Sequence, residues 1–259
     1  MPTETTSVPF DGFYRQEYTK DFVSRWDDLI GWEGRADGEN GFFTRLLRAH
    51  GARTVADVAS GTGFHAVNLA RDGFEVTATD GAANMIRQTI DNAKRLGAHL
   101  ADTRVVDWTE LSSEFGADRF DALICLGNAF SHIFDHETRR EALSAMFEVL
   151  RPGGVAIIDH RNYDDILDNG FSTKHKFYYT GEDVDARPVE INKTLCKFEY
   201  SFPDGTSYNL HLYPLRFDYM SHLLKDAGFV DVTRYGDFER PYDRYDVDFV
   251  QQVAFKPRR

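Results

Sequence analysis

The sequence has few of the features that mark secreted, membrane-bound or disulfide-stabilised proteins. Its 259 residues include only two cysteines, Cys125 and Cys196. We therefore expect no disulfide framework, and we expect the protein in a reducing compartment. No apolar run approaches the ~18 residues that span a membrane. The amino-terminal MPTETTSVPF also lacks the basic and then apolar order of a signal peptide. The sequence therefore predicts a cytoplasmic protein that does not enter membranes.

Basic residues are also in deficit. Lys and Arg total 30 against 42 Asp and Glu, which gives a formal net charge of -12. Because nucleic acids and anionic lipids bind basic surfaces, neither is expected as a partner. Two interpretations of the acidic excess stay open: solubility alone, or adaptation to salt, which screens the repulsion among surface carboxylates.

The chain does have a regular alternation of apolar and amphipathic segments from about residue 52 to 160. The amphipathic segments, such as 83–96 and 138–150, are predicted helices. The apolar runs between them are predicted strands, at 54–59, 75–79, 103–106, 120–127 and 154–159. Strands that are apolar almost throughout and alternate with helices predict a parallel sheet covered on both faces.

Residues 175–217 break this rhythm. Segments 193–202 and 208–215 alternate apolar and polar residues around a turn signal at 203–206, so they predict a β-hairpin. One helix and two strands are then expected at 219–227, 231–235 and 248–255. The last two strands are too close in sequence for a crossover helix, so they are expected to pair antiparallel.

This order of elements resembles the class I S-adenosylmethionine-dependent methyltransferase fold. That fold is a Rossmann-like α/β sheet of mostly parallel strands with one antiparallel strand inserted near its carboxyl-terminal end. The resemblance implies three parts: a helical segment at 1–50, the methyltransferase domain at 51–174 and 218–259, and an inserted antiparallel hairpin subdomain at 175–217. The first segment is expected in two helix-like stretches, which either close the site as a lid or pack against the sheet edge.

Ligand-compatible residues follow the first two predicted strands. The first strand contains Asp57 and runs into the turn Gly61-Thr62-Gly63, and the second strand ends on Asp80. Glycines let a ligand approach the backbone closely, and an acid at the end of the second strand can accept both hydroxyls of a ribose. Asp57 suits a ligand ammonium group or an ordered water. These residues predict a nucleoside-binding βαβ unit.

Further candidates follow the later strands. Asp107 and Trp108 come after the third strand, either to bind an adenine or as a helix cap with a buried aromatic ring. Asn128 ends the fourth strand and can hydrogen-bond a small polar substrate. Arg161 follows the fifth strand, and its planar fork suits a carboxylate. The alternative for Arg161 is an ion pair with a neighbouring aspartate.

Other classes of function are weighed against this one. A nicotinamide dehydrogenase needs a general acid for hydride transfer, but the chain has no Tyr-x-x-x-Lys pair and ends in an antiparallel hairpin. A ligand-sensing protein with the same fold is the non-enzymatic alternative. The spacing His132-x-x-x-His136, with Asp135 between, offers no third ligand, so no metal is expected.

Four segments carry a more specific resemblance. They are DVASGTG at 57–63, CLGNAFSH at 125–132, RPGG at 151–154 and IDHRNY at 158–163. These segments are similar to the glycine N-methyltransferase family, and most of all to the bacterial glycine/sarcosine N-methyltransferases that begin betaine synthesis. The similarity runs from about Tyr18 to Lys256.

The family resemblance implies a reaction and its substrates. S-adenosyl-L-methionine would methylate glycine to sarcosine and sarcosine to N,N-dimethylglycine, leaving S-adenosyl-L-homocysteine. Methylation of glycine alone, or of another small carboxylate-bearing amine, is the alternative. Betaine is a compatible solute, which gives the acidic charge an osmoprotective interpretation.

The expected site residues fall into two groups. Residues predicted at the donor are Tyr18, Trp26, Arg35, Ala59, Gly61, Asp80, Asp107, Trp108, Leu126 and His132. Of these, the resemblance implies that Arg35 binds the donor carboxylate. It also implies that Arg161 holds the acceptor carboxylate with Asn128 beside the amine, and Tyr178, Tyr213 and Tyr242 are the expected tyrosines around the amine.

Three points about this site stay open. His132 is either a general base or a hydrogen-bonded neighbour. Leu29 stands where the resemblance leads us to expect an aromatic side chain. The brief amino-terminal segment leaves a monomer or a small homo-oligomer as the expected assembly.

Overall fold

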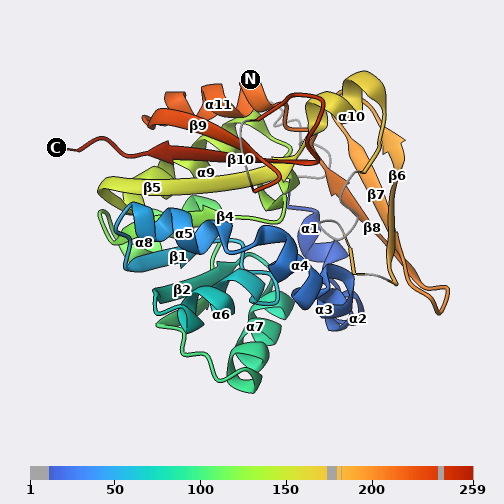
Figure 1. The fold of residues 1–259 in the computed structure, drawn as a ribbon, viewed down its shortest axis with the longest axis horizontal. Helices are drawn as coiled ribbons and strands as arrows, with labels where there is room; N and C mark the ends of the chain where they lie inside the picture. The colour runs from blue at the N-terminus through green and yellow to red at the C-terminus, as the bar shows by residue number, and fades with distance from the viewer. Residues whose placement is uncertain (1–11, 174–179, 182, 239–241, 259) are drawn as a thin grey trace, which may run out of the picture.

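The computed structural model describes residues 12–173, 180–181, 183–238 and 242–258, and in them the chain forms two sheets (Figure 1). The larger sheet has seven strands in the order β3-β2-β1-β4-β5-β10-β9. They are β1 Thr54–Asp57, β2 Glu75–Asp80, β3 Asp102–Val105, β4 Phe120–Cys125, β5 Leu150–Arg161, β9 Val230–Gly236 and β10 Phe249–Phe255. Strands β1 to β5 pair in parallel, as predicted.

Strand β10 is inserted between β5 and β9 and pairs antiparallel with both. This confirms the expected arrangement. Five parallel strands are followed by a sixth, β9, and the reversed strand β10 lies between the fifth and the sixth. The reversal follows from the chain length available, because the link between β9 and β10 is too short for a crossover helix.

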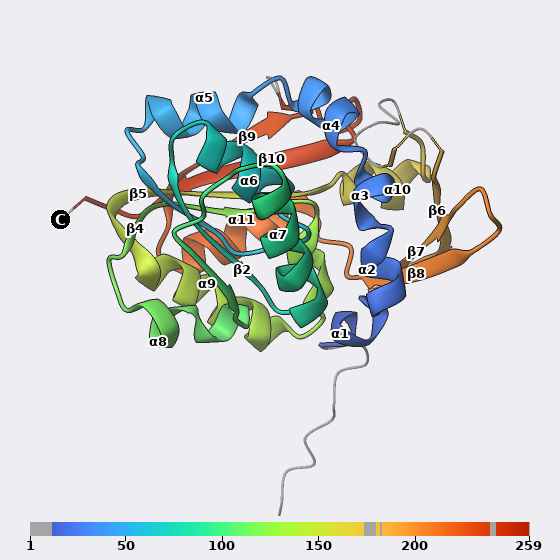
Figure 2. The same cartoon turned by 90° about the horizontal axis from the view of Figure 1, so that it is seen from below.

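Helices cover both faces of this sheet, because its buried strands present alternate side chains to opposite sides (Figure 2). Val55 and Ile157 join one core with α5 and α6, while Ala56 and Ile158 join the other core with α9 and α11. These helices are α6 Phe64–Arg71, α7 Ala83–Arg95, α8 Leu111–Phe115, α9 His136–Val149, α10 Tyr163–Asn169 and α11 Phe217–Asp226, with 3-10 turns η1 Trp108–Glu110 and η2 Ala129–His132. The predicted helices at 83–96, 138–150 and 219–227 are present.

The amino-terminal segment is broken into more helices than the two expected stretches. They are α1 Tyr14–Glu17, α2 Lys20–Ser24, α3 Trp26–Ile30, α4 Trp32–Glu39 and α5 Phe42–Ala49. Gly31 and Gly41 have positive φ, at 58° and 64°, and so interrupt the helix at two points. Helices α1 to α4 lie beyond the carboxyl ends of the parallel strands, between the two sheets, whereas α5 packs on a face of the large sheet (Figures 1 and 2).

The smaller sheet is antiparallel, in the order β6-β7-β8. Its strands are β6 Asp185–Ile191, β7 Cys196–Ser201 and β8 Ser207–Leu212. The predicted hairpin corresponds to β7 and β8. Strand β6 was not expected, because it is mostly exposed, contains Pro188 and lacks the apolar alternation of a buried strand.

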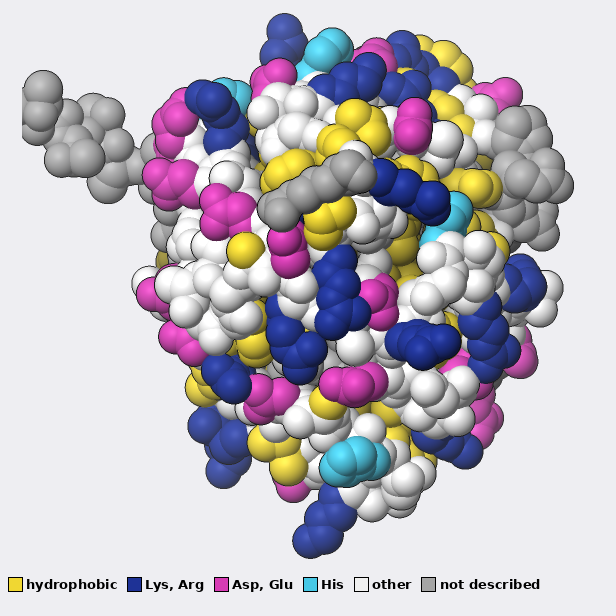
Figure 3. All heavy atoms as spheres, turned by 90° about the vertical axis from the view of Figure 1, so that its left-hand side faces the viewer, with side chains coloured by type: hydrophobic (Ala, Val, Ile, Leu, Met, Phe, Trp, Pro, Cys, Tyr) yellow, Lys and Arg dark blue, Asp and Glu magenta, His cyan; other side chains and the backbone are white. Residues whose placement is uncertain are grey.

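The opposite end of the large sheet, where the parallel strands begin, has a different character. Basic and acidic side chains are interspersed over this side of the molecule (Figure 3). Ion pairs at the beginnings of the strands join Arg151 to Asp121 at 2.6 Å and Lys256 to Asp118 at 2.8 Å. Among the described residues, no helix combines the length and apolar character required to cross a bilayer.

Candidate active site

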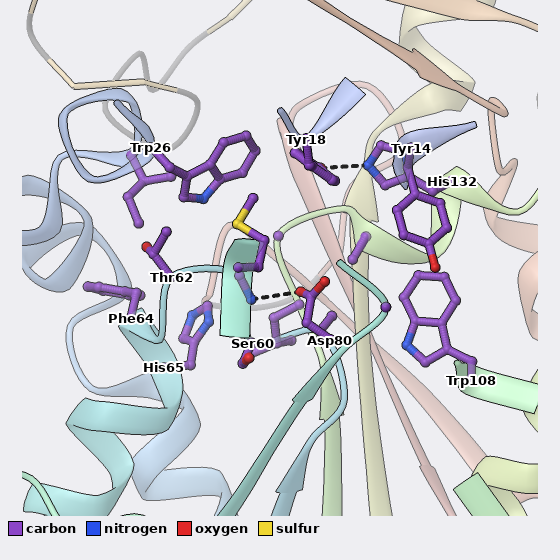
Figure 4. Close-up of a pocket in the computed structure, with 18 of the residues that line it drawn as sticks. Tyr14, Tyr18, Trp26, Ser60, Thr62, Phe64, His65, Asp80, Trp108 and His132 are labelled. Carbon is purple, nitrogen blue, oxygen red and sulfur yellow. Dashed lines mark hydrogen bonds between the residues drawn. The ribbon is translucent and has the colours of Figure 1, made fainter. Parts of the chain in front are cut away.

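A cavity that is partly open to solvent lies where the parallel strands end, beneath the amino-terminal helices (Figure 4). Nine of the ten residues predicted at the donor line it: Tyr18, Trp26, Arg35, Ala59, Gly61, Asp80, Trp108, Leu126 and His132. Sequence reasoning missed other lining residues, among them Tyr14, His65 and Met85. Because these side chains come from separate elements of the chain, only the fold brings them together.

The floor of this cavity is built by the turn after β1 and by the end of β2. Gly61 and Gly63 have φ values of 55° and 97°, which permit the tight turn. The amide of Gly61 donates to Asp80 Oδ2 at 3.0 Å, and the amide of Ala82 donates to Oδ1 at 2.8 Å. Burial raises the pKa of Asp80 to about 7 against these two hydrogen bonds. Asp80 is therefore a positioned acceptor with lone pairs left for ligand hydroxyls.

One side of the cavity carries a buried ionic cluster. Arg35 Nε donates to Glu39 Oε1 at 2.8 Å, and His65 Nε2 lies 2.9 Å from the same oxygen. Burial alone would raise the pKa of Glu39, but His65 and Arg35 outweigh it and lower that pKa. Both Arg35 and His65 line the cavity whereas Glu39 lies behind them. Asp57, also buried, accepts a hydrogen bond from the Ala59 amide and does not line the cavity.

The amino-terminal helices cover the cavity from above. Tyr18 and His132 are joined by a 2.8 Å hydrogen bond between Oη and Nε2 (Figure 4). Trp26 packs edge-on against Tyr18 with 5.2 Å between ring centroids. Burial lowers the pKa of His132 to about 4, so this imidazole is neutral at physiological pH. Helices α1 to α4 thus border the cavity and α5 packs on the sheet, while the opening and closing of this segment as a lid stays a prediction.

Asp107 and Trp108 have different surroundings. Asp107 accepts from the Thr109 amide at 3.1 Å, which caps the 3-10 turn η1, and also pairs with Arg15. Asp107 is not among the residues that line the cavity, so its adenine-binding role stays a prediction. Trp108 does line the cavity and donates from Nε1 to the Val58 carbonyl at 2.7 Å.

A second cavity adjoins the first deeper in the molecule. The two share Tyr18, Trp26, Ile30, Arg35, Gly127 and His132 as lining residues. Only the second is lined by Asn128, Arg161, Tyr200, Leu29, Leu210, Leu212 and Phe249. A ligand at the first cavity would therefore meet a ligand at the second across their shared wall.

Arg161 is a buried cation that lines only the second cavity, with 4% of its surface exposed. Its guanidinium carbon lies 4.4 Å from the ring centroid of Phe198 and 5.6 Å from that of Phe249. Nη2 is 3.4 Å from the hydroxyl of Tyr200. Of the neighbouring acids, Asp159 accepts from the Asn128 amide, and Asp164 pairs with Arg216 and Arg244. These contacts hold the guanidinium plane in one orientation.

Asn128 connects the ends of β4 and β5. Its Oδ1 accepts from the backbone amide of Arg161 at 3.0 Å and from Ser131 Oγ at 2.9 Å. Its Nδ2 donates to Tyr163 Oη at 2.9 Å, which leaves one N–H of the amide. Asn128 thus positions Arg161 and keeps a single donor for a ligand.

The predicted acceptor tyrosines have mixed outcomes. Tyr178 lies outside the described residues. Tyr213 lies beneath the guanidinium of Arg139 at 4.0 Å, and Tyr242 packs on Phe217 with 4.8 Å between centroids. Neither lines the two cavities, so their roles stay predictions.

Tyr200 lies at the second cavity in their place. It shares the alternation of Cys196 and Phe198 along β7, so all three point to the buried face of the small sheet. That alternation was visible in the sequence. Which face of the sheet would meet the site was not.

Metal-binding side chains form no obvious cluster within the residues that the structure describes. No group of three His, Cys, Asp or Glu side chains that could hold an ion is found in the parts of the chain that the structure describes. His136, considered from its spacing to His132, lies 2.8 Å from the hydroxyl of Tyr219 through Nδ1.

Comparison with known proteins agrees with this geometry. A family model described as a methyltransferase domain matches residues 55–154. A crystal structure of an S-adenosylmethionine-dependent methyltransferase from Clostridium acetobutylicum is similar in fold, with a TM-score of 0.69 and 16% identity, covering 92% of this chain and 98% of that one.

Sequence relatives are more specific. The glycine/sarcosine N-methyltransferase of Aphanothece halophytica is 44% identical over 94% of this chain and 91% of its own length. The glycine/sarcosine N-methyltransferase of Halorhodospira halochloris is 42% identical over 99% of this chain and 95% of its own length. The chain belongs to the glycine/sarcosine N-methyltransferase family of S-adenosylmethionine-dependent enzymes, on the class I methyltransferase fold.

Proposed function

We propose that this protein transfers methyl groups from S-adenosyl-L-methionine to the nitrogen of glycine and then of sarcosine, which yields N,N-dimethylglycine. The observation that carries this proposal is the junction of two cavities, one with Asp80 and Arg35 and the other with Arg161. The names of the Aphanothece and Halorhodospira relatives support the same pair of acceptors.

The first cavity suits the methyl donor. Asp80 accepts hydrogen bonds from the ribose hydroxyls, and the aromatic side chains of Trp108 and Tyr14 offer apolar surface to the adenine. Arg35 pairs with the donor carboxylate. The bound donor supplies a methyl group that is already activated by the positive charge on its sulfur.

The second cavity suits the acceptor. Arg161 pairs bidentately with the acceptor carboxylate, and the remaining Asn128 N–H and the Tyr200 hydroxyl lie on the same cavity wall. Because the carboxylate is held at Arg161, the amine extends toward the shared wall with the donor cavity. This orientation selects small amino acids whose amine is one carbon from the carboxylate.

The protein contributes chiefly alignment to the reaction. The amine lone pair forms the new N–C bond as the C–S bond breaks, and the methylated ammonium then loses one proton. Holding both reactants in line contributes on the order of 7–11 kcal/mol to lowering the barrier. His132 is a poor base because burial lowers its pKa to about 4. The amine is therefore deprotonated before binding or through water.

The cellular setting is part of the same proposal. Methylation of glycine to dimethylglycine comprises the first steps of betaine synthesis, and the net charge of -12 suits an osmoprotective role in salt. Both cysteines are buried and form no disulfide, in keeping with a reducing cytoplasm. We propose a monomer or small homo-oligomer as the active form.

One experiment tests the proposed reaction. The purified protein is incubated with methyl-labelled S-adenosyl-L-methionine and separately with glycine, sarcosine and dimethylglycine, and products are identified by mass. We expect label in sarcosine and dimethylglycine from the first two acceptors and none from dimethylglycine. Binding of the donor without turnover on glycine or sarcosine would contradict the acceptor assignment while leaving the fold intact.

A further inference from the structure

The acceptor cavity has an apolar wall that glycine itself does not need. Three leucines, Leu29, Leu210 and Leu212, line the same cavity as Arg161 and Asn128. They come from two different elements, the lid helix α3 and the strand β8 of the small sheet. Each is at most 3% exposed, so this wall is almost entirely shielded from bulk solvent.

The leucines are held in place by the local structure. Leu210 and Leu212 alternate along β8 and pair with Phe198 and Cys196 of β7, so both point to the buried face of the small sheet. The carbonyl of Leu29 accepts a 2.6 Å hydrogen bond from the amide of Gly181, which ties α3 to the inserted segment.

This close approach requires glycine at position 181. A Cβ on Gly181 would lie 2.4 Å from the carbonyl oxygen of Asp28. The backbone beside Leu29 is therefore packed closely against the inserted segment.

In the proposed reaction, the leucine side chains of this wall can contact an alkyl group on the acceptor nitrogen. Glycine offers a carboxylate, a methylene and an amine, whereas each methylation adds an apolar group to the nitrogen. Resting on the proposed function, we infer that Leu29, Leu210 and Leu212 form a subsite for the alkyl group already present on the acceptor nitrogen. The acceptor class is then the N-alkylglycines, with N-ethylglycine as an unnatural member, and the leucines set how large that alkyl group can be.

The test compares acceptors within one protein preparation. The ratio of kcat/KM for sarcosine to kcat/KM for glycine cancels the folded fraction and the donor affinity, because both acceptors meet the same enzyme. In Leu29→Ala and Leu212→Ala we expect this ratio to fall about fourfold, the effect of the ~0.8 kcal/mol that one buried methyl or methylene is worth.

The second part of the test varies the size of the side chain at position 29. Leu29→Ala enlarges the subsite, so kcat/KM for N-ethylglycine should rise relative to sarcosine. Leu29→Phe fills the subsite, and the same ratio should fall. Opposite movement of one ratio in two variants of one residue is a result that general loosening of the lid does not produce.

Leu195→Ala is the matched control. Leu195 is buried beside β7, with 9% of its surface exposed, but lines neither cavity. Its acceptor ratios should equal those of the unmodified protein. Calorimetric titration with S-adenosyl-L-homocysteine should give an unchanged Kd for Leu212→Ala, whose side chain does not line the donor cavity.

The outcomes separate two failures. If the unmodified protein methylates neither glycine nor sarcosine, the proposed function is wrong and this inference falls with it. If it methylates both, and the acceptor ratios are unchanged in all three variants at Leu29 and Leu212, the N-alkyl subsite is wrong and the proposed function stands. Equal changes in Leu195→Ala would likewise overturn the subsite.

Discussion

Glu39 accepts a 2.8 Å hydrogen bond from Arg35 one helical turn earlier in α4, and the same carboxylate oxygen lies 2.9 Å from His65 Nε2. Arg35 and His65 both line the donor cavity, whereas Glu39 does not. Glu39 therefore acts on a bound donor only by orienting these two side chains. The guanidinium of Arg35 and the imidazole of His65 also offset the loss of hydration that the buried Glu39 carboxylate suffers.

Replacing Glu39 tests this positioning role. In Glu39→Gln the donor Kd should rise roughly tenfold, since the ~1.5 kcal/mol or more of a charge-assisted hydrogen bond no longer orients Arg35. The acceptor KM at saturating donor should be unchanged. Glu33→Gln, on the exposed side of the same helix, is the matched control. Tighter donor binding in Glu39→Gln would show that the carboxylate competes for Arg35 rather than positioning it.

Arg161 is expected to recognise the acceptor through its shape as well as its charge. In Arg161→Lys the KM for glycine should rise more than about tenfold, because an ammonium cannot reproduce two parallel hydrogen bonds of ~1.5–3 kcal/mol each. Donor affinity should be retained, and titration with S-adenosyl-L-homocysteine measures it. Arg187→Lys, an exposed ion-paired arginine on β6, serves as control. An unaltered KM in Arg161→Lys would assign Arg161 a purely structural role.

The ionised carboxylate of Asp80 is expected to lower the stability of the ligand-free protein while it strengthens donor binding. Its pKa is raised by burial from 3.8 to about 7, so between those values the folded protein binds this proton more tightly than the unfolded chain. Stability contributed by the site therefore falls as the pH rises through that window. In Asp80→Asn we expect a higher Tm for the ligand-free protein, with a difference that is largest near pH 8, smaller at pH 5 and absent below about pH 4.

The same variant should bind the donor poorly. Loss of the charged acceptor for ribose hydroxyls should raise the donor Kd more than about tenfold. Because hydroxyl donors favour the ionised carboxylate, donor affinity of the unmodified protein should increase from pH 6 to pH 8. A donor Kd that is flat over this range, together with an unchanged Tm in Asp80→Asn, would refute both the raised pKa and the ribose role.

His132 is expected to have a positioning role rather than a catalytic one. A general base contributes typically 10²–10⁴-fold to a rate, whereas one neutral hydrogen bond to Tyr18 is worth ~1 kcal/mol, or about fivefold. In His132→Gln we expect kcat to fall by about fivefold at most. Activity should still rise toward alkaline pH, because the rise reports the neutral amine of the acceptor. A loss above a hundredfold with a flattened pH profile and intact donor binding would identify His132 as the base.

The parallel strands and the donor site could be predicted because their signals are local. The central strands are largely apolar, glycines occupy the turn at 61–63, and an acid ends β2. The exposed strand β6 has no such signal, since its side chains face solvent and are free to be polar.

The acceptor site depended on contacts between distant segments. Alternation along β7 and β8 puts Tyr200 on the same face as Leu210, but no local signal states which face meets Arg161. Glu39 likewise resembles any exposed helical glutamate until α4 is packed against α6, which brings His65 to it.

The sequence by itself determined the fold class, the donor-binding turn and the candidate carboxylate clamp, because periodicity and short motifs encode local backbone geometry and strand ends. The tertiary structure alone decided which side chains share a cavity. It brought Leu29 of the lid against Leu210 and Leu212 of the inserted sheet, placed Glu39 behind Arg35, and left Tyr213 outside. The physical reason is that packing, unlike periodicity, is set by how separate elements dock on one another.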